Sequence, residues 1–360
     1  MKDIIYDFNY FQNKYPNIVK LYSFTKQDKE WHAEGNVAIH TEMVLKELLS
    51  NPYYETISED SKKIVAYACF FHDLGKPYTT KEENGRIVSP NHSKVGEKEF
   101  RKLFFDIDFE FRESVAMLIR YHGYPIHYYD KKEHDIVRLA EIVNLKLLYL
   151  LAMSDMKGRI SDPEEQEQHI YSVDYFKDCS RYYGCYSSPK EFETPEHKLR
   201  YIRTGEEYAP FVEKRSNVYL MVGIPGSGKD YYVNNNLSDI ESISYDKFRH
   251  DLGIKHGDKK GTGQIIQASK KRAKELMAKD TDFVWNATNL MKDRRGELID
   301  LFMSYGATVH IVYVERPLKT ILVQNKDREY SLPSDKILDY LAKVDIPTNE
   351  EAHTLTLVIG

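Results

Sequence analysis

A glycine-rich segment in the second half of the chain has the residue types and spacing that bind phosphate. It fits the pattern G-x-x-x-x-G-K, follows the apolar run 218–222 and precedes a helical pattern. Glycines allow backbone N–H groups to approach phosphate oxygens, a helix N-terminus adds positive potential, and the lysine supplies a cation. We therefore expect a nucleotide triphosphate to be bound by Gly223, Ile224, Pro225, Gly226, Ser227, Gly228, Lys229 and Asp230.

Two carboxylates and one arginine near this segment have side chains suited to phosphoryl transfer. Asp230 stands where the motif usually has Ser or Thr, and a carboxylate can also hold Mg²⁺, directly or through water. Asp246 follows a short predicted strand and can accept a proton from an attacking hydroxyl. Arg328 lies in a predicted mobile lid, from which it can reach the transferring phosphate. The expected cofactor is ATP or another NTP with Mg²⁺.

The first half of the chain contains a different set of potential ligands: His40, His72, Asp73, His92, His122 and Asp155. Any one of them alone is more often a satisfied polar group than a ligand. Neutral imidazoles and carboxylates together can bind divalent transition metals with open coordination positions. Such a metal acidifies water and polarises a phosphoryl oxygen. The ligand types do not choose among Mn²⁺, Co²⁺, Ni²⁺ and Fe, as one ion or two.

The order of these residues resembles the HD phosphohydrolase superfamily, above all in the segment 71–77, FHDLGKP. The segments NHS and RYHG, which contain His92 and His122, are similar to the HD domain of bacterial tRNA nucleotidyltransferases. The resemblance implies that Asp73 bridges two metals. The first metal would be held by His40, His72, Asp73 and Asp155, and the second by His92 and His122, with His127 a weaker candidate. Lys76 either neutralises the substrate phosphate or is a surface lysine at a helix end.

Four segments of the second half, GIPGSGKD, SYDKFR, NATNLMKDRR and NKDRE, resemble the 5′-hydroxyl polynucleotide kinase family of phage and bacterial RNA repair. The resemblance covers most of 217–345. It implies that Asp246 is the general base toward the 5′-hydroxyl and that Arg249 contacts the phosphate backbone of the acceptor. We also expect Asn289 to contact the substrate. The residues implied on the donor phosphates are Lys229 and Arg328.

The elements that position these residues differ between the two halves. Apolar residues recur three and four apart up to about Asp155, which predicts helices at about 61–71, 110–121 and 134–156. From Asn217 onward, short apolar runs alternate with helical patterns, which predicts an α/β domain with a parallel sheet. The expected strands are 218–222, 242–244, 282–286 and 307–314, with 353–359 a further candidate. Residues 158–215 are expected to form irregular structure and short helices.

We therefore expect two domains: an all-α HD-type phosphohydrolase domain at 1–205 and an α/β P-loop kinase domain with a parallel sheet at 217–360, joined by a linker at 206–216. The length of 360 residues fits two domains. A net charge of -5 argues against a protein that coats nucleic acid non-specifically. Three cysteines, a polar N-terminus and no apolar run of about 18 residues predict a cytoplasmic protein without a membrane segment.

The two activities together suggest a substrate. RNA cleavage by internal transesterification leaves a 2′,3′-cyclic phosphate and a 5′-hydroxyl, whereas a ligase needs a 5′-phosphate and a free 3′-hydroxyl. The whole chain resembles a bacterial and phage family in which an HD domain precedes a polynucleotide kinase. The resemblance implies RNA ends, or DNA ends, as substrate and an RNA ligase as functional partner. The alternatives are a nucleotide-metabolism enzyme, with an HD nucleotidase beside a nucleoside or sugar kinase, and a nucleotide-sensing regulator.

Overall fold

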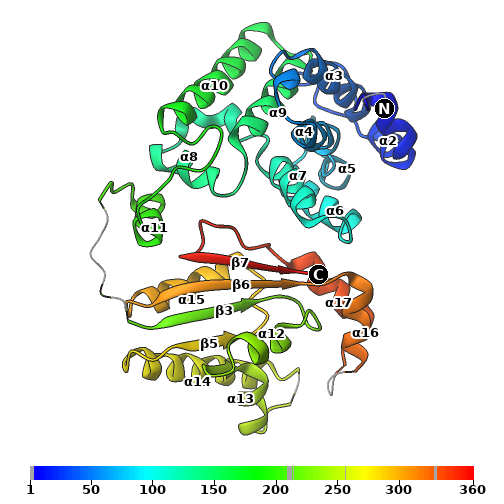
Figure 1. Cartoon of the computed structure of the whole chain (residues 1–360). Helices are drawn as coiled ribbons and strands as arrows, with labels where there is room; N and C mark the ends of the chain where they lie inside the picture. The colour runs from blue at the N-terminus through cyan, green and yellow to red at the C-terminus, as the bar shows by residue number, and fades with distance from the viewer. Residues whose placement is uncertain (1–3, 209–212, 214, 256, 328–330) are drawn as a thin grey trace. The chain divides into compact units, whose positions relative to one another are not determined.

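The chain divides into two units, Met1–Glu191 and Phe192–Gly360 (Figure 1). The computed structural model describes residues 4–208, 213, 215–255, 257–327 and 331–360. The division falls before helix α11 (Pro195–Thr204), which we had placed in the first domain, ahead of a linker at 206–216. Two hydrogen bonds tie α11 to the second unit. Lys198 Nζ donates to the Asn349 carbonyl oxygen at 2.9 Å, and Arg203 Nη1 donates to Asp300 Oδ1 at 2.8 Å.

The first unit is helical apart from one short antiparallel hairpin of β1 (Lys81–Glu83) and β2 (Arg86–Val88). No helix in the described part of the chain is both long and apolar enough to cross a membrane. The helices are α1 (Phe8–Lys14), α2 (Pro16–Phe24), α3 (Val37–Ser50), η1 (Tyr54–Thr56), α4 (Glu59–Phe71), α5 (Lys76–Thr79), α6 (His92–Leu103), α7 (Phe109–Tyr121), η2 (Pro125–Asp130), α8 (Glu133–Ala140), α9 (Leu145–Lys157) and α10 (Pro163–Tyr182).

Helices α3, α7 and α9 pack around α4, and the four together form the core of this unit. The last seven residues of α4, from Val65 to Phe71, are all buried, as are those of α9 from Leu147 to Met156. Side-chain caps fix where three of these helices begin: Asn36 accepts from the Ile39 N–H, Ser58 from the Ser61 N–H, and Asn144 from the Leu147 N–H. Packing of the buried faces and capping of the helix starts together fix the positions of these helix ends.

Two of our expectations for this unit were wrong. The single helix expected at 134–156 is two helices, because Asn144 caps a new helix after the break that follows α8. The stretch 158–215, expected to form irregular structure and only short helices, contains α10, a helix of 20 residues. Its start signal is local: Asp162 caps the helix, Pro163 occupies the first turn, and two glutamates follow. Few residues of α10 are buried, so its apolar periodicity is weak.

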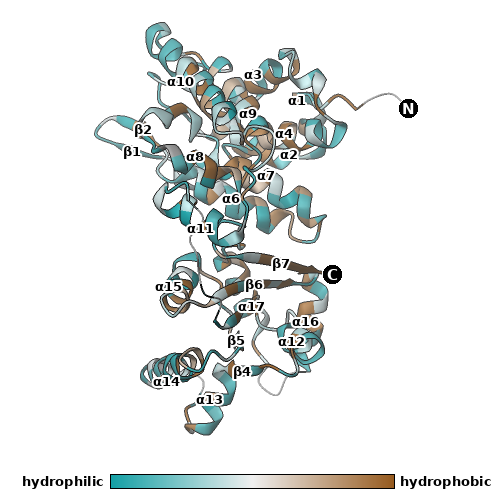
Figure 2. Ribbon diagram, turned by 60° about the vertical axis from the view of Figure 1, so that its left-hand side comes forward, coloured by the Kyte–Doolittle hydropathy of each residue, from teal (hydrophilic) through white to brown (hydrophobic). Residues whose placement is uncertain are grey.

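The second unit is built on a five-stranded parallel sheet with the strand order β4-β5-β3-β6-β7. The strands are β3 (Asn217–Val222), β4 (Glu241–Ser244), β5 (Phe283–Asn286), β6 (Thr308–Glu315) and β7 (Thr354–Ile359). All four expected strands and the candidate fifth are present. The central strands β3, β5 and β6 are mostly buried, and Figure 2 shows hydrophobic residues along β6. Loops that follow parallel strands all lie at one edge of the sheet, where α/β proteins bind ligands.

Helices connect these strands, as expected for parallel neighbours. They are α12 (Lys229–Asn236), α13 (Tyr245–Asp251), α14 (Lys259–Met277), α15 (Lys292–Met303), α16 (Leu318–Lys326) and α17 (Ser334–Lys343). One buried ion pair ties α15 to the C-terminal segment. Arg295 is fully buried and donates to both carboxylate oxygens of Glu351 at 2.7 and 2.8 Å. Its Nη1 also donates to the carbonyl oxygens of Asn289 and Leu290.

We predict that Arg295→Ala destabilises the second unit by about 3–5 kcal/mol, because it leaves the buried Glu351 carboxylate without its partner. Each unit contains one of the two tryptophans, so Trp285 fluorescence in a Trp31→Phe background reports unfolding of the second unit. Arg294→Ala is the matched control. Its side chain is 70% exposed and pairs with Glu297 on the same helix, so we expect a change of less than about 1 kcal/mol. Equal unfolding midpoints for the two variants would contradict a structural role for Arg295.

Candidate functional site

The structure brings together all six predicted metal ligands of the first unit. Four lie at helix ends: His40 in the first turn of α3, His92 at the start of α6, and His72 and His122 directly after α4 and α7. Asp73 follows His72, and Asp155 lies in the last turn of α9. Among the six, two triads have candidate ligand atoms within 4.8 Å of one another, His40–His72–Asp73 and Asp73–His92–His122. Both contain Asp73, as the predicted bridging role requires.

The Nε2 atoms of the histidines face one another and the carboxylates. His40 Nε2 lies 3.3 Å from His72 Nε2 and 3.1 Å from Asp155 Oδ1. Asp73 places Oδ2 at 3.4 Å from His72 Nε2 and Oδ1 at 3.6 Å from His92 Nε2. Two ligand atoms that are each about 2.1 Å from one ion are roughly 3–4 Å apart. The spacing of these atoms therefore suits shared divalent ions.

The opposite ring nitrogens are held by the protein backbone. The Nδ1 atoms of His72, His92 and His122 lie 2.8–2.9 Å from the carbonyl oxygens of Cys69, Ser89 and Ile119, respectively. His40 Nδ1 lies 3.1 Å from the Gly158 carbonyl oxygen and 3.0 Å from Glu34 Oε1. Since these oxygens only accept, each Nδ1 carries the proton and each neutral ring presents the Nε2 lone pair to the others. Facing lone pairs repel unless a cation or a proton lies between them.

A close approach of two helices brings His92 to Asp73. Gly75, two residues after Asp73, lies against α6: a Cβ atom there would be 1.9 Å from the His92 carbonyl oxygen and 2.6 Å from the Gly96 nitrogen. Any other residue would push α6 away and separate His92 from Asp73. The glycine of the FHDLGKP segment is thus needed for the second triad.

The electrostatics of the cluster favour a cation. Burial opposes charge on every member, and it lowers the pKa of His122 to about 3 and also lowers that of His92. Burial would raise the pKa of Asp73, but His72 and Lys76 hold it well below its usual value. Burial opposes charge on His72 as well, yet Asp73 and Asp155 raise the pKa of His72. Two ionised carboxylates thus create a negative potential among largely neutral imidazoles, which suits a divalent metal.

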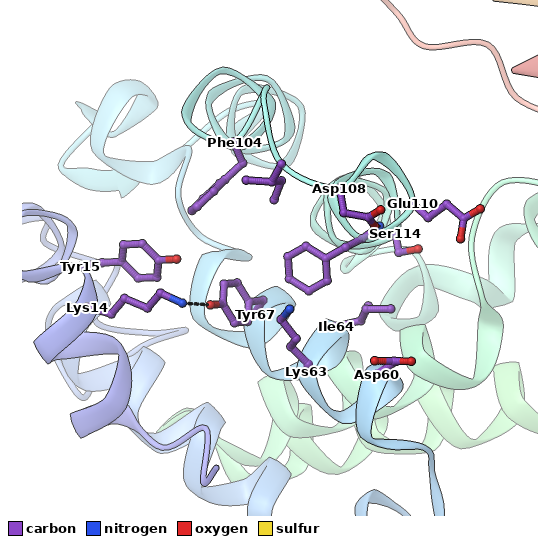
Figure 3. A pocket seen from close by; sticks show the side chains of 12 residues that line it. Lys14, Tyr15, Asp60, Lys63, Ile64, Tyr67, Phe104, Asp108, Glu110 and Ser114 are labelled. Carbon is purple, nitrogen blue, oxygen red and sulfur yellow. Dashed lines mark hydrogen bonds between the residues drawn. The ribbon is translucent and has the colours of Figure 1, made fainter. Parts of the chain in front are cut away.

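Four of the six ligands, Asp73, His92, His122 and Asp155, line a cavity of about 350 Å³. Lys76 is buried in its wall and points at the cluster, with Nζ 2.7 Å from Asp73 Oδ2, so it is not a surface lysine. His127 also lines the cavity, although it belongs to neither triad. A larger cavity of about 660 Å³ lies among aromatic rings near Lys14 and Tyr67 (Figure 3). It contains none of the predicted site residues.

Four further residues belong to the site, and the sequence analysis missed them. Arg159 Nη2 donates to Asp155 Oδ1 at 2.5 Å, a contact that its position one turn after Asp155 could have suggested. Glu34 accepts from the Nδ1 atoms of His40 and of His32. His32 lines the cavity, and burial lowers its pKa to about 3. His169 of α10 also lines the cavity.

The phosphate-binding loop of the second unit lies between β3 and α12, as predicted. Gly226 and Gly228 have φ angles of +83° and +96°, which favour glycine, and a Cβ atom on Gly223 would lie 2.6 Å from both Ser227 Oγ and the Val314 carbonyl oxygen. Lys229 Nζ donates to the carbonyl oxygens of Gly223 and Ile224 at 2.8 and 3.0 Å, so its ammonium lies over the loop. Ser227 Oγ is buried without a hydrogen-bond partner in the described part of the chain. The loop therefore fits a nucleotide phosphate.

Two asparagines at the end of β5 have different roles. Asn286 Nδ2 donates to Asp230 Oδ1 at 2.7 Å and orients the carboxylate that replaces the usual Ser or Thr. The sequence analysis missed this pair, which joins two distant segments. Asn289, predicted to contact substrate, has its side-chain amide bonded to the Met221 carbonyl oxygen at 2.7 Å, behind the loop. Its substrate contact stays a prediction. Arg328 lies outside the described residues.

The predicted acceptor-side residues lie on α13, directly after β4. Asp246 is in the first turn, and its side chain is 69% exposed. Arg249 lies one turn later, with Nε 4.0 Å from Asp246 Oδ1. The Nε and Nη1 atoms of Arg249 are buried and have no hydrogen-bond partner among the residues described. A largely buried guanidinium with N–H groups free of hydrogen bonds to the described residues is suited to a phosphate or carboxylate ligand.

Comparison with known families supports both sites. Residues 36–148 match the HD domain, a range that includes all the predicted metal ligands except Asp155. Residues 218–347 match the AAA domain, a range that includes the phosphate-binding loop. The chain thus contains a helical HD domain followed by an α/β domain with a P-loop and a parallel sheet. HD domains typically bind divalent metals, and a P-loop of this kind implies an NTP with Mg²⁺.

Several solved structures are similar to about two fifths of the chain. They include a Chloroflexus aurantiacus protein described as a kinase (13% identity, TM-score 0.34, covering 40% of this chain and 85% of that one). A gluconokinase from Sinorhizobium meliloti (14%, TM-score 0.29, 41% and 84%) and a sugar kinase from Janibacter (18%, TM-score 0.28, 41% and 86%) are also similar. At such identities and TM-scores, these likenesses carry no weight for substrate or activity. No curated protein matches the chain in sequence.

Proposed function

We propose that the chain heals RNA ends: the HD domain removes a 2′-, 3′- or 2′,3′-cyclic phosphate, and the P-loop domain transfers a phosphoryl group from an NTP to a 5′-hydroxyl. The observation that carries the proposal is Arg249 next to Asp246: the Arg249 side chain is largely buried, and its Nε and Nη1 atoms have no hydrogen-bond partner among the described residues. A hydroxyl acceptor that also presents a phosphate fits this pair, and the 5′-terminal nucleotide of a polynucleotide has such a phosphate on its 3′ side. A nucleoside or a neutral sugar does not.

In the HD domain, each hydrolytic step forms a bond between phosphorus and a water oxygen and breaks one P–O bond to the ribose. A divalent metal held by the two triads would acidify that water and polarise the phosphoryl oxygen. The protein orients the imidazoles through their Nδ1 partners and keeps Asp73 and Asp155 ionised. Lys76 and Arg159 line the cavity and supply positive charge for the phosphate. A cyclic phosphate opens to a monoester first, and a second hydrolysis releases inorganic phosphate.

In the P-loop domain, Asp246 accepts the proton of the 5′-hydroxyl while its oxygen attacks the γ-phosphorus of the donor. The bond from that phosphorus to the β-phosphate oxygen breaks, and the nucleoside diphosphate leaves. Lys229 and the amides of the loop stabilise the charge on the transferring group. Asp230, oriented by Asn286, is the expected ligand of Mg²⁺. Arg249 holds the 3′ phosphate of the terminal nucleotide and so positions the hydroxyl.

The two reactions should be separable on one RNA oligonucleotide with a 5′-hydroxyl and a 2′,3′-cyclic phosphate. We predict that Asp73→Asn lowers removal of the terminal phosphate by at least about 100-fold, because it weakens both triads. We predict a similar loss of 5′ phosphorylation in Lys229→Ala, since donor-charge stabilisation is lost. Each variant should keep the other reaction, measured by gel analysis of end-labelled RNA. Loss of both reactions in both variants would contradict independent sites.

Arg249→Ala tests the substrate class of the kinase. We predict that it raises KM for a 5′-hydroxyl oligonucleotide by roughly 10–100-fold, because a charged hydrogen bond contributes about 1.5–3 kcal/mol. Steady-state transfer from labelled ATP would be compared for the oligonucleotide, a nucleoside 3′-phosphate and a nucleoside. Arg272→Ala, which removes an exposed arginine from α14, is the control. If the wild type prefers nucleosides or sugars, the chain is a nucleotide-metabolism enzyme instead. No transfer to any acceptor would favour a nucleotide-sensing regulator.

A further inference from the structure

Three tyrosines of the HD domain form an exposed stack of rings. Tyr129 lies on η2, and Tyr171 and Tyr175 lie one turn apart on α10. The ring of Tyr129 is almost parallel to both, at 12° and 6.0 Å from Tyr171 and at 11° and 5.1 Å from Tyr175. Their exposed fractions are 53%, 63% and 41%. We call these three residues the tyrosine platform. Clusters of large exposed aromatic side chains mark interaction sites more often than they stabilise a fold.

The two elements that carry the tyrosine platform, η2 and α10, also contribute residues to the metal cavity. His127 of η2 and His169 of α10 pack together, with ring centroids 6.1 Å apart, and both line the cavity. Trp31, which also lines the cavity, packs against His169 at 5.8 Å. Each histidine is two residues from a tyrosine of the platform, and on a helix that spacing turns the two side chains toward different sides. A strand whose terminal phosphate lies at the metal cluster would therefore have to bend around η2 and α10 to reach the platform.

The chemistry of the platform fits unpaired nucleobases. Flat exposed rings bind bases by stacking, which is worth about 1–3 kcal/mol per base and needs no base-specific hydrogen bonds. The surrounding charge is mixed. Lys131 and Lys132 follow η2 and are exposed, whereas Glu164, Glu165 and Glu167 lie on the first turns of α10. Attraction to the phosphate backbone is accordingly modest here, and stacking is the interaction that this surface can supply.

We propose that the tyrosine platform stacks the bases that precede a phosphate-bearing RNA 3′ end and so delivers the terminal phosphate to the metal cavity. This inference rests on the proposed removal of terminal phosphates from RNA. It assigns a recognition surface that makes the HD domain favour oligonucleotides over small phosphate esters. The platform acts on binding of the single strand, and no platform residue contacts the reacting phosphorus.

The test compares two substrates of the full-length, metal-loaded protein: a short single-stranded RNA with a 2′,3′-cyclic phosphate, and bis(p-nitrophenyl) phosphate, which has no base. We expect Tyr129→Ala, Tyr171→Ala and Tyr175→Ala each to lower kcat/KM for the RNA by about 10-fold, mainly through KM. The corresponding Phe variants should retain RNA hydrolysis, because the ring is kept. Tyr182→Ala is the control: it lies on the same helix, is 83% exposed and is not part of the stack.

A second measurement removes the stacked bases from the RNA instead of the tyrosine rings from the protein. Replacing the two bases next to the terminal nucleotide by abasic residues should lower kcat/KM for the wild type, with little further loss in Tyr129→Ala. Fully additive losses would overturn the stacking contact, as would RNA hydrolysis that is unchanged in the Ala variants. An equal loss on both substrates would overturn it too, since the rings would then only support the cavity. A wild type that hydrolyses bis(p-nitrophenyl) phosphate but no RNA end would overturn both this inference and the proposed function.

Discussion

Two carboxylates, Asp73 and Asp155, are buried in one cavity, and the arrangement of the first unit depends on offsetting their charge. An isolated ion moved out of water costs several kcal/mol even after the protein relaxes. Lys76 forms an ion pair with Asp73, and Arg159 forms one with Asp155. The Nε2 atoms of His40 and His72 point at these carboxylates. The remaining negative potential is what a divalent metal would neutralise. Binding of metal and stability of the HD domain are therefore linked.

Helix ends and glycine contacts give this cluster its geometry. His72 and His122 occupy the first position after a buried helix, where the ring nitrogen can bond to a carbonyl oxygen of the last turn. The apolar faces of α4 and α9 hold those ends in place, and Gly75 lets α6 approach closely enough for His92 to join Asp73. The second unit uses backbone geometry in the same way, because a parallel sheet aligns the phosphate-binding loop after β3 with Asn286 and α13 at one edge.

Features whose residues are contiguous in the sequence were predicted well, and features formed by residues that only tertiary packing brings together were not. The phosphate-binding loop was predicted in full because its glycines, lysine, strand and helix are contiguous. The six candidate ligands were found from their order along the chain, although they lie on or directly after five different helices. Glu34, His32 and Asn286 could not be found in this way, since their partners are set by tertiary packing. Helix α10 was missed although Asp162 and Pro163 mark its start, because its buried face is too narrow to produce clear periodicity.

The central claim is that the two triads sharing Asp73 hold divalent metal. Anomalous diffraction at the manganese edge, from crystals grown with Mn²⁺, tests it most directly. The account predicts anomalous peaks within about 2.0–2.3 Å of His72 Nε2 and the Asp73 carboxylate, with any second ion beside His92 and His122. Peaks confined to exposed carboxylates, with Asp73 paired only to Lys76, would contradict it.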